Sequence, residues 1–585
     1  MLLDSINSPE DLRNLSVEQL GGLAGEIREG LFNRLTKIGG HFGPNFGFVE
    51  ATIALHYVFD SPKDKFVFDV AHQTYAHKML TGRKAGYFDD ARFCENSGFT
   101  NPDESEHDFF NIGHTSTSVA LALGLAKARD VKGKSENIIA VIGDGSLSGG
   151  EALEALSAAG SELESNFIVV VNDNEQAIAE NHGGIYKNLK ALRESGGKCA
   201  NNLFTAFGLD YVYEENGNDV ASLIKVFEKV KDSKRPVVVH IHTQKGKGYK
   251  PAEENREAWH WTMPFDRETG ERKSGTAKKE SYGAITRNYI LEKAKKDRDL
   301  VVITPAMPMT VGLGPAERKE LGSQYLDVGI AEEAAVAAAS GVAKNGGKPL
   351  LVTSMTFIQR AYDQISQDVC INNMPVTMLM NSASVYGMND ITHLGIFGLA
   401  AFSNIPNLVV LCPTNAEEYV NMLDWSLEQR EHPVMILIPG NEVTHREAEK
   451  SYSALDTFKV EQKGEKIAVL ALGDFFQRGE ELCRAIKDEF CFSPTLINPR
   501  FASGLDKNLL EELKKDHSLV ITLESGILNG GFGEKVASFY GTSGMKVKNY
   551  GLEKKFIDRY KAEELLSSLG ITASKIVEDI KKITK

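Results

Sequence analysis

Short, almost continuously apolar segments alternate with longer segments of helical composition along most of the chain. Two of the apolar segments, Ile138 to Ile142 and Phe167 to Val171, are rich in β-branched residues, and residues 148–160 between them have helical composition and length. Parallel strands buried on both faces have this continuous apolar character, and neighbouring ones are joined by a right-handed crossover. The pattern predicts one βαβ unit over residues 138–177, around which the rest of the chain can be arranged.

The same apolar pattern returns in both directions from this unit. The charged segment 266–280 and the polar segment 439–453 lack an apolar period, which is typical of linkers. We therefore expect an α/β protein with three doubly wound domains and mainly parallel sheets, over residues 1–275, 281–445 and 454–585. The further predicted strands are residues 66–70, 236–242, 300–304, 325–328, 375–380, 466–472, 518–523 and 547–551.

Composition narrows the class of protein. A chain of 585 residues with 42% hydrophobic residues is too long for one core, which agrees with several domains. The net charge of −14 argues against a nucleic-acid or anionic-membrane surface. The N-terminus lacks a secretory pattern and no segment is apolar enough to span a bilayer, so we predict a cytoplasmic protein. Without paired spacing, the cysteines are predicted to be buried free thiols. They are Cys94, Cys199, Cys370, Cys412, Cys483 and Cys491.

Polar residues follow both strands of the central βαβ unit. Gly143, Asp144 and Gly145 come after the first strand, and Asn172 to Asn174 end the second. Ligands of such sheets bind beyond the carboxyl ends of the strands. Glycines let backbone N–H groups approach a diphosphate, and carboxylate and amide oxygens suit Mg²⁺. An Asp-Gly pair alone is a common turn, but the two strand ends together predict a site for a magnesium diphosphate.

Several other segments carry candidate chemistry, each with a structural alternative. His41, in the glycine-rich loop 39–47, is equally suited to a loop hydrogen bond, and the turn 111–118 to hydroxyl capping of the helix that follows. Lys245 lies in a loop with interleaved glycines, which could contact an anion or form a solvated turn. Glu332 is predicted at a helix N-terminus, where the helix dipole favours an acid without catalysis.

Several of these strings resemble one known family. They are GHFGPNFG, DVAHQTYAHKMLTGR, GHTSTS, GDG, NDNEQAIAEN and DVGIAE, in this order along the chain. Each is similar to a segment of the 1-deoxy-D-xylulose-5-phosphate synthases, which are transketolase-like thiamine diphosphate enzymes. The resemblance covers nearly all of the chain. It implies a transketolase-like fold, thiamine diphosphate and Mg²⁺ as cofactors, a 2-oxo acid such as pyruvate as donor, an aldehyde as acceptor, a homodimer, and a place in isoprenoid and thiamine biosynthesis.

The resemblance also implies roles for individual residues. Glu332 would hydrogen-bond the aminopyrimidine ring and activate the cofactor, and an aromatic side chain, Phe357, would stack on that ring. Histidines would orient substrates and move protons: His41, His72, His260 and His393. Magnesium would be held by Asp144, Asn174 and the carbonyl of Gln176. The other implied cofactor contacts are His72, Gly113, His114, Thr115, Gly143, Asp144, Gly145, Ser146, Asn174, Lys245 and Tyr249.

Departures from the family gather where the acceptor would bind. The family has an arginine where Ser382 stands and another shortly before the turn at Gly440, and these arginines hold the phosphate of glyceraldehyde 3-phosphate. Each charged hydrogen bond to a phosphate contributes roughly 1.5–3 kcal/mol, so losing them weakens binding by orders of magnitude unless other groups compensate. Other family residues are replaced by Asn389, Ser354, Glu333, Ala334, Ser503 and Gly504, and the segment after residue 181 is shortened.

Three hypotheses follow from the sequence. The first is a 1-deoxy-D-xylulose-5-phosphate synthase or a divergent relative. The second, motivated by the missing arginines, is ketol transfer of the transketolase type or carboligation to a different acceptor. The third is a non-catalytic thiamine diphosphate-binding paralogue, against which the retention of Glu332 and the histidines argues.

Overall fold

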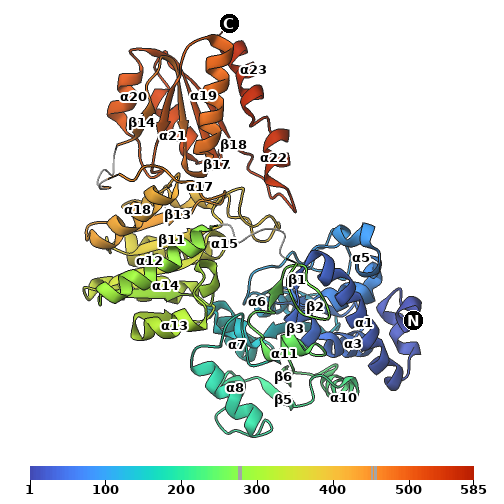
Figure 1. Cartoon of the computed structure of the whole chain (residues 1–585). Helices are drawn as coiled ribbons and strands as arrows, with labels where there is room; N and C mark the ends of the chain where they lie inside the picture. Colours follow the sequence, from blue (N-terminus) through green and yellow to red (C-terminus); the bar gives the residue numbers. More distant parts are fainter. Residues whose placement is uncertain (274–279, 450–451, 453–456, 585) are drawn as a thin grey trace. The chain divides into compact units, whose positions relative to one another are not determined.

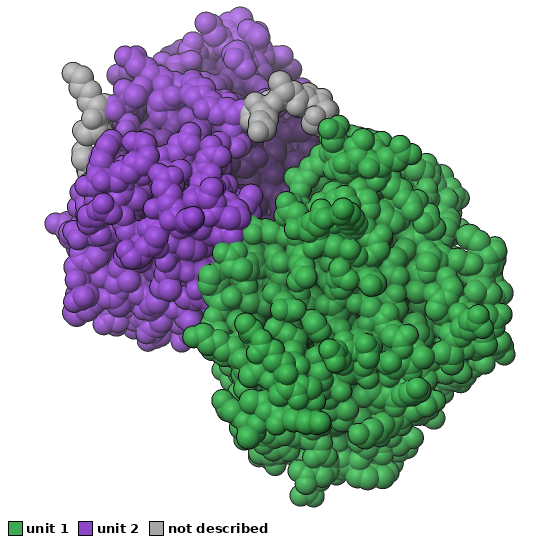
Figure 2. Space-filling view, turned by 60° about the horizontal axis from the view of Figure 1, so that its bottom comes forward, with its two compact units in different colours: residues 1–277, 329–331 green, residues 278–328, 332–585 purple. Residues whose placement is uncertain are grey.

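The computed structural model describes residues 1–273, 280–449, 452 and 457–584. The chain forms two compact units, which Figure 2 colours green and purple. Unit 1 comprises residues 1–277 with 329–331, and unit 2 comprises residues 278–328 with 332–585. Within the described residues, no helix combines the length and the apolar character that crossing a bilayer requires.

Unit 1 is built on a five-stranded parallel sheet of order β2-β3-β4-β6-β5. Strands β3 and β4 are buried along their lengths, which explains their unbroken apolar sequences. A second, two-stranded antiparallel sheet joins β1 to β7. The strands are β1 (Gly40–His41), β2 (Lys65–Phe68), β3 (Ile138–Gly143), β4 (Phe167–Asp173), β5 (Asp210–Glu214), β6 (Pro236–His242) and β7 (Trp261–Thr262).

Helices surround this sheet (Figure 1). Helix α6 packs on β3, and α10 contacts both α3 and the edge strand β5. The helices of unit 1 are α1 (Val17–Ile38), α2 (Gly43–Gly47), α3 (Val49–Val58), α4 (Tyr75–Lys78), α5 (Ala85–Phe88), α6 (Ser118–Val131), α7 (Gly150–Glu162), α8 (Gly184–Glu194), α9 (Leu203–Ala206), α10 (Val220–Val230) and α11 (Lys250–Glu254).

Unit 2 contains two further sheets. The first has six parallel strands in the order β12-β13-β11-β10-β8-β9. Its strands are β8 (Leu300–Thr304), β9 (Tyr325–Asp327), β10 (Lys348–Ser354), β11 (Thr377–Asn381), β12 (Val409–Leu411) and β13 (Val434–Leu437). Its helices are α12 (Tyr282–Lys296), α13 (Pro315–Leu321), α14 (Glu332–Lys344), α15 (Met355–Ile358), α16 (Tyr362–Gln364), α17 (Gly398–Phe402) and α18 (Ala416–Glu428).

The second sheet of unit 2, orange to red in Figure 1, has the order β14-β16-β15-β17-β18. Its edge strand β14 is antiparallel and the other pairs are parallel. The strands are β14 (Lys459–Gln462), β15 (Lys466–Ala471), β16 (Thr495–Asn498), β17 (His517–Ile527) and β18 (Lys546–Leu552). The helices are α19 (Phe476–Phe490), α20 (Lys507–Leu513), α21 (Phe532–Tyr540), α22 (Ala562–Ser568) and α23 (Ala573–Thr584).

The predicted α/β class and the mainly parallel sheets are confirmed. Every predicted strand is present, with ends that differ by a few residues at most, because buried β-branched segments have few alternatives. Each predicted domain range contains one large sheet. The second and third ranges together make up most of unit 2. The exact domain boundaries remain predictions.

The first predicted linker and the cysteines differ in part from expectation. The described start of the linker folds onto unit 1, where Arg267 pairs with Glu29 at 2.7 Å; residues 274–279 lie outside the described part. None of the six cysteines, all described, forms a disulfide, as predicted. Only Cys370, Cys412 and Cys483 are buried, so the prediction of buried thiols was wrong for Cys94 and Cys491, which are exposed, and for Cys199, which is half-buried.

A buried network of charged and polar side chains lies beside α4 in unit 1. His77 contacts His56 at 2.8 Å through one ring nitrogen and Asp108 at 2.8 Å through the other. Arg83 donates two hydrogen bonds to the same carboxylate. Burial raises the pKa of Asp108, but the hydrogen bonds from His77 and Arg83 outweigh it and hold the pKa below its usual range. Asp108 is therefore an ionised side chain on which two buried groups depend.

Replacing Asp108 by asparagine should lower the local opening free energy of this region by about 3 kcal/mol, because the buried Arg83 loses its nearer counter-charge and keeps only the contact with Glu104 at 3.4 Å. Hydrogen exchange of peptides covering residues 75–88, corrected for intrinsic exchange rates, measures the effect. Asp103→Asn, an exposed change in the same segment, is the control. Equal protection in both variants would contradict the assignment.

Candidate active site

The predicted magnesium-diphosphate cradle lies at the carboxyl ends of β3 and β4. These strands pair directly, with Gly143 opposite Asn172, so the residues that follow them emerge side by side. Asp144 is 1% exposed, and burial, followed by the charge of Asp173, raises the pKa of its carboxyl. Asn181 donates a hydrogen bond to the carboxylate at 2.7 Å.

The donor atoms in this cradle fit a hard cation. The side-chain oxygen of Asn174 is buried and has no hydrogen-bond partner, although buried polar atoms normally have one. With Asp144 it offers oxygen ligands of the kind that Mg²⁺ prefers. In the part of the chain that the structure describes, no group of three or more His, Cys, Asp or Glu is placed to hold a metal. A magnesium ion here would therefore also use carbonyl, phosphate or water oxygens.

The backbone around the cradle leaves little room for side chains. A Cβ atom on Gly145 would lie 2.8 Å from the Cβ of Ala177, which explains a glycine at this close approach. The turn 113–118 is tied to β2 by Asp69, whose carboxylate accepts from the backbone N–H of Ser116 at 2.8 Å and of Ser118 at 3.0 Å. Asp69 thus positions the segment that contains Gly113, His114 and Thr115.

Three predicted histidines come together in unit 1. The ring centroids are 5.0 Å apart for His41 and His72, 5.7 Å for His41 and His260, and 5.3 Å for His72 and His260. The short β1–β7 pairing brings His41 beside the segment that contains His260. Asn45 donates to the backbone carbonyls of both His41 and His72, at 2.8 and 2.7 Å. These two hydrogen bonds hold the segment of His72 beside the segment of His41.

The surroundings of His260 favour an uncharged imidazole. Burial, together with the charge of Lys245 and the two neighbouring histidines, lowers the pKa of His260 well below its usual value. The Nδ1 atom of His260 is buried without a hydrogen-bond partner. Burial also lowers the pKa of Lys245 to about 7, against the attraction of Asp144. His260 is therefore neutral near pH 7, and its unpartnered Nδ1 can form a hydrogen bond with a ligand.

Two other predicted contacts lie near this cluster. Lys245 is buried, and its ammonium donates to the carbonyl of Ala177, the residue that approaches Gly145 of the cradle. Tyr249 packs among aromatic rings that include Phe42 and Trp259, and its hydroxyl donates to the carbonyl of Arg267 at 3.0 Å. Contact of these side chains with the cofactor remains a prediction.

Glu332 is the first residue of α14 in unit 2, as the sequence predicts. Its side chain is buried, and burial raises its pKa to about 7, while the nearby Arg360 guanidinium opposes the shift. A nitrogen of Arg360 lies 3.3 Å from its carboxylate. A carboxyl that titrates near neutrality can hold or release a proton under physiological conditions.

The remaining predicted residues of unit 2 lie close to one another. The rings of Phe357 and His393 meet edge to face, with centroids 5.6 Å apart. His393 Nδ1 is 2.8 Å from the hydroxyl of Thr392, and burial lowers the pKa of its imidazole. Each unit thus carries its own group of predicted site residues.

Family models cover nearly the whole chain. The model described as 1-deoxy-D-xylulose-5-phosphate synthase matches residues 3–199, and that of the transketolase thiamine diphosphate binding domain matches residues 116–286. The transketolase pyrimidine binding domain matches residues 278–445, and the transketolase C-terminal domain matches residues 456–576.

Whole proteins give the same result. The 1-deoxy-D-xylulose-5-phosphate synthase of Shouchella clausii is 38% identical, over 99% of this chain and 98% of that protein. This chain belongs to the 1-deoxy-D-xylulose-5-phosphate synthase family. Another synthase of the family, from Geobacter sulfurreducens, is 36% identical over 98% of this chain and 96% of its own. Members of this family are thiamine diphosphate-dependent transferases, and the chain is an enzyme of that class.

Among solved structures, a transketolase from Campylobacter jejuni resembles the chain, with a TM-score of 0.42 and 18% identity over 97% of this chain and all of that chain. A transketolase from Leishmania mexicana has a TM-score of 0.43 and 16% identity over 97% of both chains.

The positions at which this synthase-family chain departs from the family are folded into unit 2. Ser382 follows β11 with a φ of 53°, and its hydroxyl contacts the side-chain oxygen of Asn381 at 3.3 Å. The amide of Asn389 donates to the carbonyl of Tyr560 at 2.7 Å. Ser354 is buried at the end of β10, and its hydroxyl has no hydrogen-bond partner. Neutral residues stand at all three positions.

Sequence reasoning missed three positioning residues. Asp69 lies at the start of one of the family-like strings, and an acid at a strand end shortly before a histidine is a usable signal. Asn45 lies in the glycine-rich loop beside His41, and nothing local indicates its two distant carbonyl partners. Arg360 contacts the carboxylate of Glu332, and no local pattern connects these two distant positions.

Proposed function

We propose that this chain uses thiamine diphosphate to decarboxylate pyruvate and join the two-carbon unit to an aldehyde. With glyceraldehyde 3-phosphate as acceptor, the product is 1-deoxy-D-xylulose 5-phosphate, the compound after which the family is called. The observation that carries the proposal is the retention of a buried glutamate, Glu332, at a helix start, alongside the oxygen-lined cradle at Asp144 and Asn174.

Bound thiamine diphosphate supplies the stabilisation of the carbanion that forms when a 2-oxo acid loses CO₂. The chain would bind and orient this group. Asp144, Asn174 and the carbonyl of Gln176 would hold the magnesium, and Phe357 would contact the pyrimidine ring. Glu332 would accept or return a proton at its carboxylate, to which its pKa near 7 is suited. The histidine cluster would orient substrate oxygens, with His260 as a neutral ring.

Release of labelled CO₂ from 1-¹⁴C-pyruvate tests this proposal. With thiamine diphosphate and Mg²⁺ present, release should be catalytic, and it should increase when an aldehyde is added. Mass spectrometry should find the two-carbon unit of pyruvate joined to that aldehyde. Absence of aldehyde-dependent pyruvate consumption with any acceptor would contradict the proposal and favour a non-catalytic paralogue.

A second candidate is transfer to a different acceptor, including transfer of the transketolase type. The observation that favours it is the neutral character of the positions around Ser382 and Gly440, where the resemblance places phosphate-binding arginines. Charge-assisted contacts by arginine are the usual way to recognise a phosphate, so their loss points to a change of acceptor.

We further propose Mg²⁺ as the metal, a homodimer as the assembly, and the cytoplasm as the location. Magnesium is supported by the oxygen ligands at Asp144 and Asn174. An isoprenoid role follows from family membership. A contribution to thiamine biosynthesis would require the same product and depends on the acceptor.

A further inference from the structure

Unit 2 contains an open cavity of about 780 Å³ next to the loop that carries His393. It is lined by residues of the loop 385–389, the turn 440–444, the start of α19 and the segment 560–563. The first two segments follow β11 and β13, and they contain or adjoin the positions at which the family arginines are missing. The cavity therefore lies where the chain differs most from its family.

Two residues that line the cavity carry buried polar atoms that lack partners. The side-chain oxygen of Asn441 and the hydroxyl of Tyr560 are buried, and neither has a hydrogen-bond partner. Both residues line the cavity, and Tyr560 is only 9% exposed. Both atoms are covered, so a ligand group or water reaches them only after a small movement of the lining. Because buried polar atoms are rarely left unpaired, such a movement would gain a hydrogen bond for each. A hydroxyl group can both donate and accept, so it can serve either atom.

The charge of the cavity is unfavourable for an anion. Its lining includes four carboxylates and two basic groups, which gives a formal charge of −2. Burial raises the pKa of Asp474, but even with this carboxyl protonated the cavity would not be positive. The acids are Glu442, Asp474, Glu481 and Glu563, and the bases are Arg478 and Lys561.

Both basic groups are already paired. The guanidinium of Arg478 contacts both carboxylate oxygens of Glu563 at 2.5 Å and donates to the hydroxyl of Tyr386 at 2.9 Å. The ammonium of Lys561 donates to Glu564 at 2.7 Å. A phosphate would have to displace these carboxylates before it met an uncompensated positive charge.

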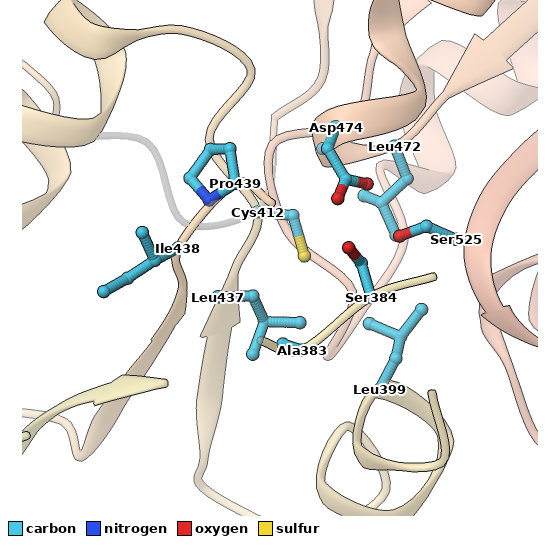
Figure 3. A pocket seen from close by; sticks show the side chains of 11 residues that line it. Ala383, Ser384, Leu399, Cys412, Leu437, Ile438, Pro439, Leu472, Asp474 and Ser525 are labelled. Carbon is cyan, nitrogen blue, oxygen red and sulfur yellow. The ribbon is translucent and has the colours of Figure 1, made fainter. Parts of the chain in front are cut away.

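A carboxylate also joins the two loops that lack the arginines. Asp474 accepts hydrogen bonds from the hydroxyls of Ser384 and Ser525, and from the backbone N–H of Gly440 at 3.5 Å. Figure 3 shows Asp474, Ser384 and Ser525 around a second, separate cavity of about 20 Å³. A Cβ atom on Gly440 would lie 2.8 Å from the oxygen of Ser384, so this turn has no room for a longer side chain without movement.

We propose that this cavity binds the distal end of the acceptor, and that the acceptor is an unphosphorylated aldehyde bearing hydroxyl groups. The inference rests on the proposed carboligation and names the substrate class for that reaction. Hydroxyl groups satisfy the buried oxygens of Asn441 and Tyr560, whereas a phosphate dianion is repelled by the surrounding carboxylates.

Two acceptors that differ only in the phosphate provide the test. The full chain, with thiamine diphosphate, Mg²⁺ and saturating pyruvate, should have a kcat/KM for D-glyceraldehyde at least about tenfold above that for D-glyceraldehyde 3-phosphate. A higher kcat/KM for the phosphorylated aldehyde overturns the inference and leaves the proposed function standing. Absence of aldehyde-dependent pyruvate consumption overturns the proposed function, and the inference falls with it.

One variant tests the charge argument directly. Glu563→Gln removes the carboxylate that neutralises Arg478, so the ratio of kcat/KM for the phosphorylated aldehyde to that for D-glyceraldehyde should increase about tenfold. Glu489→Gln, on α19, is the control, because it also removes one negative charge but at an exposed site outside the cavity, where Glu489 pairs with Lys581. This variant should leave the ratio unchanged. An unchanged ratio in Glu563→Gln, or an equal change in both variants, overturns the role of the cavity charge.

Discussion

Replacing Glu332 by glutamine should lower kcat for pyruvate consumption by roughly 10²–10⁴-fold, the range observed when a group that transfers a proton is removed. Glu332 is buried at the start of α14, and burial raises the pKa of its carboxyl to about 7. Glutamine preserves the size and one hydrogen-bonding oxygen but cannot carry or release the proton. The change therefore separates proton chemistry from packing.

The neighbouring glutamate provides a matched control. Glu333 has the same side chain and occupies the next position of the helix, but it is half-buried, and its charge makes only a lesser contribution to the raised pKa of Glu332. Glu333→Gln should keep kcat near that of the parent, while circular dichroism checks that both variants are folded. If Glu332→Gln retained a tenth or more of the activity, the proposed proton role of Glu332 would be wrong.

Asp144→Asn should weaken binding of thiamine diphosphate in the presence of Mg²⁺ by roughly 100-fold or more. Loss of a group that merely orients a metal ligand typically costs 10–100-fold in metal affinity, so loss of a charged ligand should cost at least as much. The carboxylate is buried at the end of β3, beside the unpartnered oxygen of Asn174. The neighbouring carboxylate of Asp173 is already engaged by Arg193 and His240, so it is not a ready substitute. Isothermal titration calorimetry measures the affinity without relying on activity.

Removal of the metal distinguishes this role from a structural one. Chelation with EDTA should weaken cofactor binding strongly in the parent and much less in Asp144→Asn, because the variant has already lost the metal-dependent part. Asp210→Asn, an exposed change on β5 of the same sheet, is the control and should behave as the parent does. An equal effect of EDTA on the parent and on Asp144→Asn would exclude Asp144 as a metal ligand.

Local sequence was sufficient wherever the physical cause was local. The strand from Pro236 to His242 and the strand from Leu300 to Thr304 have the ends that their patterns predict, because short segments dominated by β-branched apolar residues are typical of buried parallel strands. The cradle was predictable for the same reason. Parallel strands that are neighbours in the sheet bring the residues after their carboxyl ends together, which places Asp144 near Asn174.

Contacts between distant segments were not predictable in this way. His41 and His260 are far apart in the chain, and the two-residue pairing of β1 with β7 that joins their segments is too short to produce a sequence pattern. Arg360 contacts Glu332, which lies on another helix, so no local spacing indicates the pair. Such choices depend on packing between elements, which local periodicity does not encode.

The sequence by itself determined the α/β class, the strand positions, the polar strand ends that form the predicted cradle, and the absence of the two family arginines, because each depends on residue type and local order. Only the tertiary structure decided what surrounds those missing arginines. Asp474 and Arg478 follow β15, in the second sheet of unit 2. Folding places them against the loop at Ser384 and the turn at Gly440. The resulting charge of the cavity is a sum over residues from distant segments, so it exists only once the chain is folded.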